Sequence, residues 1–229
     1  MKRPFFTLAE VLVTLAIIGI VAAMTLPALQ NSTNKMENVV ALKKAYYALS
    51  QANYSIMADN GGSILSALSG ATTHEDFANV FISKLNIAKN CGIASVKATG
   101  CFPDTGYKWL NGSNLTSNFS ASINDSMILT NDGMSYAFYL YSSNCTFNAS
   151  SPSSISSPLY NFCGQIFVDI NGRNKGPTTV GRDLFHFYLT EKGFYPFGSF
   201  SNADIWSSDC LTNGFGCASK VLLEGAMNY

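Results

Sequence analysis

The residues from Phe6 to Gln30, FTLAEVLVTLAIIGIVAAMTLPALQ, form an almost uninterrupted apolar segment near the amino terminus. Glu10 is the only charged residue in this segment, and Lys2 and Arg3 stand just before it. Nothing ionises from Val11 to Leu29, a length of about 28 Å as a helix, which is close to the thickness of a bilayer core. The segment therefore predicts a membrane-spanning helix that carries one carboxylate near its start.

The charges and cysteines indicate on which side of the membrane the rest of the chain lies. A short basic leader favours a cytoplasmic start and an exported body. All six cysteines lie downstream of the apolar segment and form no CxxC pair, so disulfides in an oxidising compartment are expected rather than a zinc site. Sequence proximity favours Cys91–Cys101, Cys145–Cys163 and Cys210–Cys217, although other pairings stay open, as do reduced, buried cysteines in a cytosolic domain.

A cleaved signal peptide is the first alternative for the apolar segment. Val21-Ala22-Ala23 offers small residues for a cut after Ala23. Against this interpretation, Glu10 would interrupt the apolar core of the signal, and the apolar pattern continues to Leu29.

The stretch Phe6-Thr7-Leu8-Ala9-Glu10, between a basic leader and a long apolar run, resembles the start of type IV pilins and type II secretion pseudopilins. Gly19 and Pro27 lie where those families place a glycine and a proline. The resemblance extends to Gln30 and implies a leader at 1–5 and an assembly helix at 6–30. It also implies cleavage between Phe5 and Phe6 by a prepilin peptidase, with N-methylation of Phe6. The family's leader usually ends in Gly, where this chain has Phe5.

The motif residues have physical roles that suit a filament. A bare carboxylate inside a membrane helix costs about 2–3 kcal/mol unless it is paired, and cleavage before Phe6 would create an amine to pair with Glu10. Pro27 removes a helix hydrogen bond, and Gly19 lowers helix propensity, so both positions weaken the helix. The plainer alternatives are an unpartnered Glu10 at headgroup depth and a simple kink with small residues for helix packing.

The remaining chain predicts an α+β domain. Amphipathic spacing from Met36 to Met57 continues the helix, so one long helix is expected from Thr7 to Ala58, with residues 31–59 packing on an exported domain at 60–229. Ser63–Thr72 is expected to be a loop, followed by a helix that Thr73 caps and that ends near Asn90.

An antiparallel sheet is expected in the second half of the chain. Asn131-Asp132-Gly133 is a hairpin signal between two strands, and later strands are predicted at Gln165–Ile170, Leu184–Thr190 and Phe194–Phe197. Loops are expected where the sequence lacks periodicity or closes on cysteines: Cys91–Phe102, Asn111–Asn124, Ala149–Pro158, Asn171–Arg182 and a tail from Ser199 to Tyr229 that covers the sheet.

The sequence offers little catalytic chemistry. Neither histidine lies in a metal or nucleophile motif, and His186 alternates with strand residues in a way typical of a structural position. Asp169, Asn171 and Asp183 are candidate calcium ligands, as in some pseudopilins, although turn formation is the favoured explanation and the spacing is not that of an EF-hand. No cofactor is otherwise expected.

The sequence thus favours a pilin-like structural subunit over an enzyme. The resemblance implies a single-pass protein of the inner membrane that is later extracted into a periplasmic or cell-surface filament. Its implied partners are other pilin-like subunits, the prepilin peptidase, a platform membrane protein and an assembly ATPase. The alternatives are a membrane-anchored binding module or a minor tip pilin that recognises DNA or a surface, and, with less support, a secreted hydrolase. Equal numbers of acidic and basic residues give no global field for nucleic acid.

Overall fold

The computed structural model describes residues 7–93, 100–115, 125–151, 154–173, 175–176, 178–200 and 209–229, with only the backbone described at 26–32. The chain divides into two units, Met1–Glu37 and Asn38–Tyr229, and each is described by itself. Helix α1, Leu8–Asp59, belongs to both. The expected long helix is confirmed, but the globular unit begins at Asn38 rather than at residue 60, because the second half of α1 supplies part of its core.

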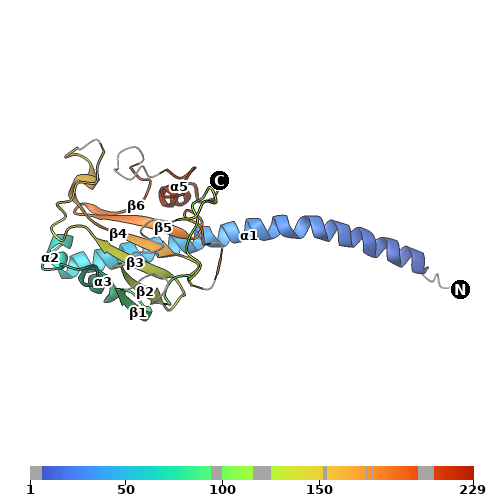
Figure 1. Ribbon diagram of the computed structural model, residues 1–229, viewed down its shortest axis with the longest axis horizontal. Helices are drawn as coiled ribbons and strands as arrows, with labels where there is room; N and C mark the ends of the chain where they lie inside the picture. The colour runs from blue at the N-terminus through green and yellow to red at the C-terminus, as the bar shows by residue number, and fades with distance from the viewer. Residues whose placement is uncertain are drawn as a thin grey trace. The chain divides into compact units, whose positions relative to one another are not determined.

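The globular unit contains a six-stranded antiparallel sheet whose strands follow one another in chain order (Figure 1). This arrangement and α1 confirm the expected α+β class with an antiparallel sheet. The strands are β1 (Ile87–Ile93), β2 (Ser126–Thr130), β3 (Ser135–Leu140), β4 (Phe162–Asp169), β5 (Leu184–Thr190) and β6 (Gly193–Pro196). The predicted hairpin forms around Gly133, whose φ is 85°.

The second half of α1 packs on one face of this sheet. Its core side chains recur at three- and four-residue steps, so they lie on one side of the helix. Tyr46 stacks on Phe187 at 5.9 Å and on Phe194 at 6.1 Å between ring centroids. The buried side chains of this helix face are Val39, Leu42, Ala45, Leu49, Ala52, Asn53 and Ile56.

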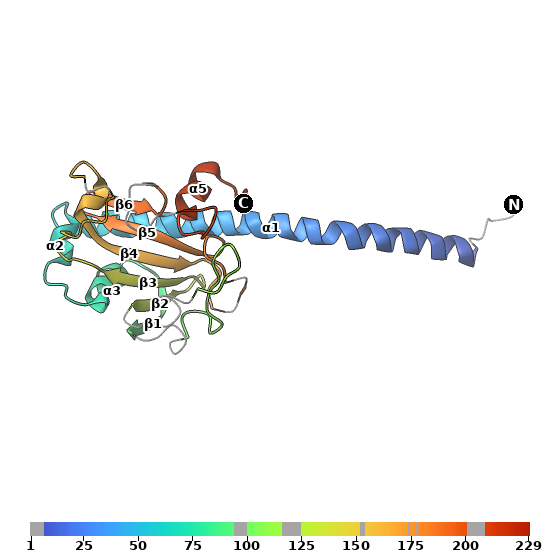
Figure 2. The same ribbon diagram turned by 45° about the horizontal axis from the view of Figure 1, so that its top comes forward.

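Three shorter helices complete the structure on this side: α2 (Ile64–Leu68), α3 (His74–Ile82) and α5 (Cys217–Glu224). Thr73 and Asp76 form the capping box of α3, as the sequence suggested for Thr73. Phe77 and Phe81 of α3 pack on Phe138 of β3. Helix α5 buries Cys217, Ala218 and Val221 in the same core as α1 (Figure 2).

Among the described residues, loops and the short 3-10 helix η1 (Pro158–Asn161) cover the opposite face of the sheet. Phe102, Tyr107 and Leu115 pack on Met127, Ala137 and Phe167, among others, from that face. Ala149, Leu159 and Phe197 pack on Phe162 and Tyr188. The sheet is therefore buried on both faces, which explains why β4 and β5 have no exposed residue.

Three predictions of local structure were wrong. Ser63–Thr72 contains α2, which Ser63 caps. Helix α3 ends at Ile82, and β1 occupies the residues expected to be helical, because pairing with β2 outweighs their helical spacing. The tail forms α5, whose end is marked by Gly225 with φ 66°.

The three disulfides join the cysteine pairs that proximity favoured: Cys91–Cys101, Cys145–Cys163 and Cys210–Cys217. They tie β1, β4 and α5 to loops that cover the sheet. Parts of the expected loops, at 94–99, 116–124, 152–153 and 201–208, lie outside the described residues.

Gly172 provides a test of the packing at one end of the sheet. A Cβ on Gly172, at φ 67°, would lie 1.9 Å from the Gly133 carbonyl oxygen, whereas a Cβ on Gly112, at φ 87°, would meet no atom within 4 Å. Both Gly→Ala changes carry the cost of a left-handed backbone, about 1–2 kcal/mol. We expect Gly112→Ala to lose about that much in urea unfolding, and Gly172→Ala to lose at least ~3 kcal/mol because backbone must move. Equal losses would contradict the described contact.

Candidate functional site

The first turn of α1 holds the only carboxylate of the apolar segment. The Thr7 N–H and the Thr7 hydroxyl both donate to the Glu10 carboxylate at 2.8 Å, and the Glu10 N–H donates to the Thr7 hydroxyl at 3.3 Å. This is a capping box, in which the side chains at the N-cap and at the third helical position satisfy each other's backbone donors. The spacing T-x-x-E from Thr7 to Glu10 is the sequence signal for this capping box, and it was not among the predictions made from the sequence.

The capping box gives Glu10 a partner within its own chain. The capping box is compatible with both expectations for Glu10, an ion pair with an amine and an unpaired carboxylate at headgroup depth. Thr7 and Glu10 both follow the expected cut, so cleavage before Phe6 would leave the capping box intact. A carboxylate that accepts two hydrogen bonds still carries its charge and has oxygen lone pairs left for a cation. Phe5 and Phe6 lie outside the described residues.

The apolar part of α1 is exposed along the described stretch Leu8–Thr25. Leu8–Thr25 has a mean hydropathy of 2.3 and is long and apolar enough to cross a membrane. None of this stretch is buried, and Leu8 and Met24 are 79% and 75% exposed. The polar groups of Thr14 and Thr25 are satisfied locally, because their hydroxyls donate to the Val11 and Val21 carbonyls at 2.9 Å. The helix surface therefore suits lipid or the apolar helices of other proteins.

The two predicted weak points lie within continuous helix. α1 runs through Gly19 and Pro27 without interruption. A Cβ on Gly19 would meet nothing within 4 Å, so no contact within the chain requires glycine there. The weakening of the helix at Gly19 and Pro27 stays a prediction from backbone chemistry.

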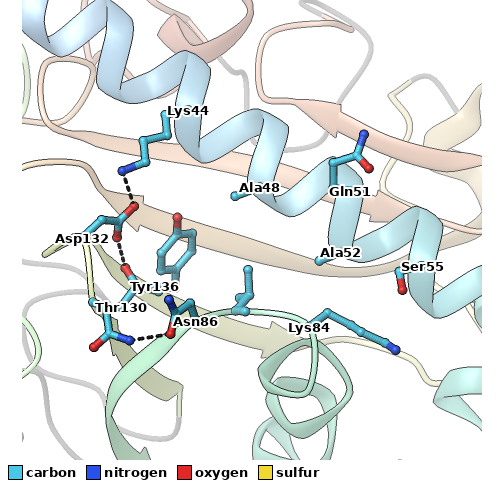
Figure 3. A pocket seen from close by; sticks show the side chains of 12 residues that line it. Lys44, Ala48, Gln51, Ala52, Ser55, Lys84, Asn86, Thr130, Asp132 and Tyr136 are labelled. Carbon is cyan, nitrogen blue, oxygen red and sulfur yellow. Dashed lines mark hydrogen bonds and ion pairs between the residues drawn. The ribbon is translucent and has the colours of Figure 1, made fainter.

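A groove lies between α1 and the turns at the edge of the sheet (Figure 3). Its volume is about 570 Å³, and Ala48, Ala52, Leu85 and the Tyr136 ring line it with apolar surface. Lys44 pairs with Asp132 at 2.8 Å, and Lys84 pairs with Asp59. Volumes of this size are typical of ligand pockets, but both lysines here are already neutralised.

The predicted calcium ligands lie close together but are arranged as acceptors for hydrogen bonds. One oxygen of Asp169 accepts the N–H groups of Asn171 and Gly172 at 2.9 Å, and the other accepts the Tyr107 hydroxyl. Asp183 accepts the N–H groups of Thr178 and Thr179. Calcium needs six to eight oxygen ligands directed at one point, and these carboxylates face donors instead. The residues do not fit a calcium ion, and their arrangement is that of turn formation.

Burial sets the protonation of these two carboxyls. It raises the pKa of Asp169 to about 7 and that of Asp183 to about 6, against the lowering effect of their hydrogen bonds. Burial, reinforced by the nearby Asp169, also raises the pKa of the Tyr107 hydroxyl. The Tyr107 hydroxyl thus ties the loop at 100–115 to the end of β4, and Asp183 closes its own loop through Thr178 and Thr179.

The two histidines have structural surroundings. His186 is buried against Phe167, Phe215 and Phe197, with ring centroids at 4.3, 4.0 and 5.3 Å, and burial lowers its pKa to about 3. His74 stacks on Tyr139 at 4.2 Å, and its Nδ1 accepts the Leu140 N–H. Across the part of the chain that the structure describes, no group of three His, Cys, Asp or Glu side chains is placed to hold a metal ion.

Scans of protein-family models, of curated proteins and of solved structures each found no match to this chain.

The buried His186 should produce a pH-dependent loss of stability. Its pKa rises from about 3 when folded to 6.5 when unfolded, so the unfolded chain binds the extra proton between these values. The contribution of the neutral His186 to the free energy of unfolding is fully present above pH 6.5. It decreases by about 1.4 kcal/mol per pH unit below that value. The variant His186→Phe lacks this term. Its unfolding free energy relative to the unmodified protein should therefore rise by about 2–3 kcal/mol from pH 6.5 to 4.5. A pH-independent difference would contradict the described burial.

Proposed function

We propose that this chain is a structural subunit of a filament of the type IV pilus or type II secretion pseudopilus kind. The observation that carries the proposal is the continuity of α1. One helix begins with a capped carboxylate, continues as an exposed apolar stretch, and ends as a core element of a disulfide-braced unit. A simple anchor does not need its apolar helix to be continuous with the core of the exported domain.

The apolar stretch accounts for two states of such a subunit. Before assembly, Leu8–Thr25 is placed in the inner membrane, with the disulfide-braced unit on the oxidising side. After assembly, the same surface is covered by the apolar helices of neighbouring copies. Either environment removes this surface from water, so transfer between them costs little hydrophobic energy.

Glu10 can form a specific contact when the apolar stretch moves from the membrane into a filament. Cleavage between Phe5 and Phe6 would create an amine, and the Glu10 carboxylate of a neighbouring copy can bind it by a charge-assisted hydrogen bond. In one chain the two groups are only four residues apart in sequence, so the pair can also form internally before assembly. The capping box holds the carboxylate at the start of the helix in both cases.

The proposed partners follow from this cycle. A prepilin peptidase would process the chain, and a platform membrane protein and an assembly ATPase would extract it from the membrane. The role proposed for the chain itself is structural, without catalysis or a cofactor.

A second candidate is a membrane-anchored binding module or a tip-located minor pilin. The groove beside Lys44 and Lys84 favours it, because its volume and its apolar floor are typical of ligand sites. The groove is compatible with a filament subunit too, so it does not distinguish the two proposals.

The variant Glu10→Gln tests the proposed role of the charge. Gln at this position can still accept the Thr7 donors of the capping box, but it cannot form an ion pair with an amine. We expect the amount of protein in sheared filaments to fall at least tenfold while the membrane pool stays unchanged. The measurement is immunodetection in both fractions.

The matched control is Thr7→Val, which removes the hydroxyl of the capping box and keeps the carboxylate. It should assemble nearly as the unmodified chain does. Normal assembly of Glu10→Gln, or an equal loss in both variants, would show that Glu10 acts only as a helix cap.

A further inference from the structure

Three polar side chains form a row across neighbouring strands on the face of the sheet opposite α1. In the β3–β4 pairing, Tyr139 lies directly opposite Gln165. Asp125 stands one residue before β2, and the β2–β3 register, continued by that residue, brings it opposite Tyr139. Asp125 alternates with Met127, which packs on this face, so the two side chains point the same way. This polar row, Asp125–Tyr139–Gln165, places a carboxyl, a phenol ring and an amide beside one another.

Two polar groups of the row are buried without a partner. Asp125 and Gln165 are only 6% and 7% exposed. Gln165 Nε2 donates to the Tyr141 hydroxyl at 3.2 Å, whereas Gln165 Oε1 accepts no hydrogen bond. Within the described part of the chain, the Asp125 carboxyl neither joins an ion pair nor accepts a hydrogen bond. Proteins pair nearly all buried polar groups, so these two acceptors suit a donor that binds from outside.

Aromatic rings flank the two acceptors. His74 stacks on Tyr139 with ring centroids at 4.2 Å, and the Tyr139 and Tyr141 rings are 4.7 Å apart. All three rings are half-buried, so the polar row lies just below the surface of the globular unit. Burial, with Tyr139 and Asp125 nearby, raises the pKa of Tyr141 to about 12, so the Asp125 carboxyl lies close to this hydroxyl. The faces of tyrosine rings attract cations.

The protonation of Asp125 depends on what binds to it. Burial raises the pKa of Asp125 to about 7. A proton on the carboxyl removes its charge, but it leaves Gln165 Oε1 without a donor. A cation that carries N–H groups satisfies both acceptors and favours the ionised carboxylate.

The acceptors of the polar row select among cations. Calcium takes six to eight oxygen ligands, whereas the row offers one carboxylate and one amide oxygen. A guanidinium presents five N–H donors in a fixed plane and needs more acceptors than these. A primary ammonium has three N–H donors, which the Asp125 carboxylate and Gln165 Oε1 can accept, and its charge suits the ring of Tyr139.

We propose that the polar row is a binding site for the primary ammonium group of a small organic amine. The Asp125 carboxylate supplies the opposite charge, Gln165 Oε1 supplies a second acceptor, and Tyr139 supplies an aromatic wall. This site lies wholly in the globular unit and does not depend on the proposed filament.

Calorimetric titration of the full chain with n-butylamine, in a neutral detergent and a phosphate buffer at pH 8, tests the site. We expect saturable binding. n-Butanol, which lacks the charge, and tetramethylammonium, which lacks N–H donors, should each bind at least tenfold more weakly.

The affinity for butylamine should also depend on pH, because the carboxyl must be ionised. With the pKa of Asp125 at about 7, the affinity should fall about tenfold or more from pH 8 to pH 6. The other titratable groups that face the polar row are His74, Tyr139 and Tyr141. Burial lowers the pKa of His74, and any charge that His74 gains would add to the fall.

Asp125→Asn keeps the shape of the side chain and removes its charge, so it should weaken butylamine binding at least tenfold. Gln165→Met removes the second acceptor at similar length and should weaken binding as well. The matched control is Asp169→Asn. Burial raises the pKa of Asp169 to about 7 too, but its oxygens accept the Tyr107 hydroxyl and two backbone N–H groups. This control should bind butylamine as the unmodified chain does, and thermal unfolding checks that each variant folds.

The inference would be overturned by an unmodified chain that shows no saturable binding, or by folded Asp125→Asn and Gln165→Met variants that bind butylamine normally. Potassium chloride that competes as strongly as butylamine would indicate a metal ion instead. Lys97, four residues after Ile93 in sequence and outside the described residues, is a second source of an ammonium group. Binding that is seen only in Lys97→Gln would assign the site to the chain's own lysine and would likewise contradict a small-amine site.

Discussion

Burial of one face of α1 against the sheet is the interaction on which the rest of the structure depends. Leu42 and Leu49 are fully buried there, and each contributes about 1.5–3 kcal/mol by leaving water. The same helix continues to Leu8 with its apolar side chains exposed. Because no loop separates the two parts, the chain carries its apolar segment as an extension of its own core.

The proposed function follows from which apolar groups can cover the exposed stretch Leu8–Thr25 of α1. Lipid and neighbouring helices are both apolar, so the segment can exchange one for the other in the proposed filament, where Glu10 is proposed to set the register. The three disulfides tie β1, β4 and α5 to neighbouring loops of the globular unit. In the proposed filament, apolar surface supplies the affinity and charge supplies the specificity.

Much of the fold could be predicted from local signals. The apolar run, the three-and-four spacing after Met36 and the Asn131-Asp132-Gly133 turn gave α1 and the β2–β3 hairpin. Residues 87–93 could not be assigned, because they become a strand only by pairing with β2, which lies distant in sequence. The capping box of Thr7 and Glu10 was readable but was overlooked. The occupied oxygens of Asp169 depend on how loops meet, which no local pattern predicts.

The mass of the mature amino terminus tests the central claim most directly. If the segment from Phe6 to Gln30 is the assembly helix of a pilin-like subunit, tandem mass spectrometry of the purified membrane form should find a chain that begins with N-methylated Phe6. Retention of Met1–Phe5 would show that the chain is a plain anchor that no prepilin peptidase processes. A chain that begins near Met24 would show a cleaved signal peptide and would contradict the filament altogether.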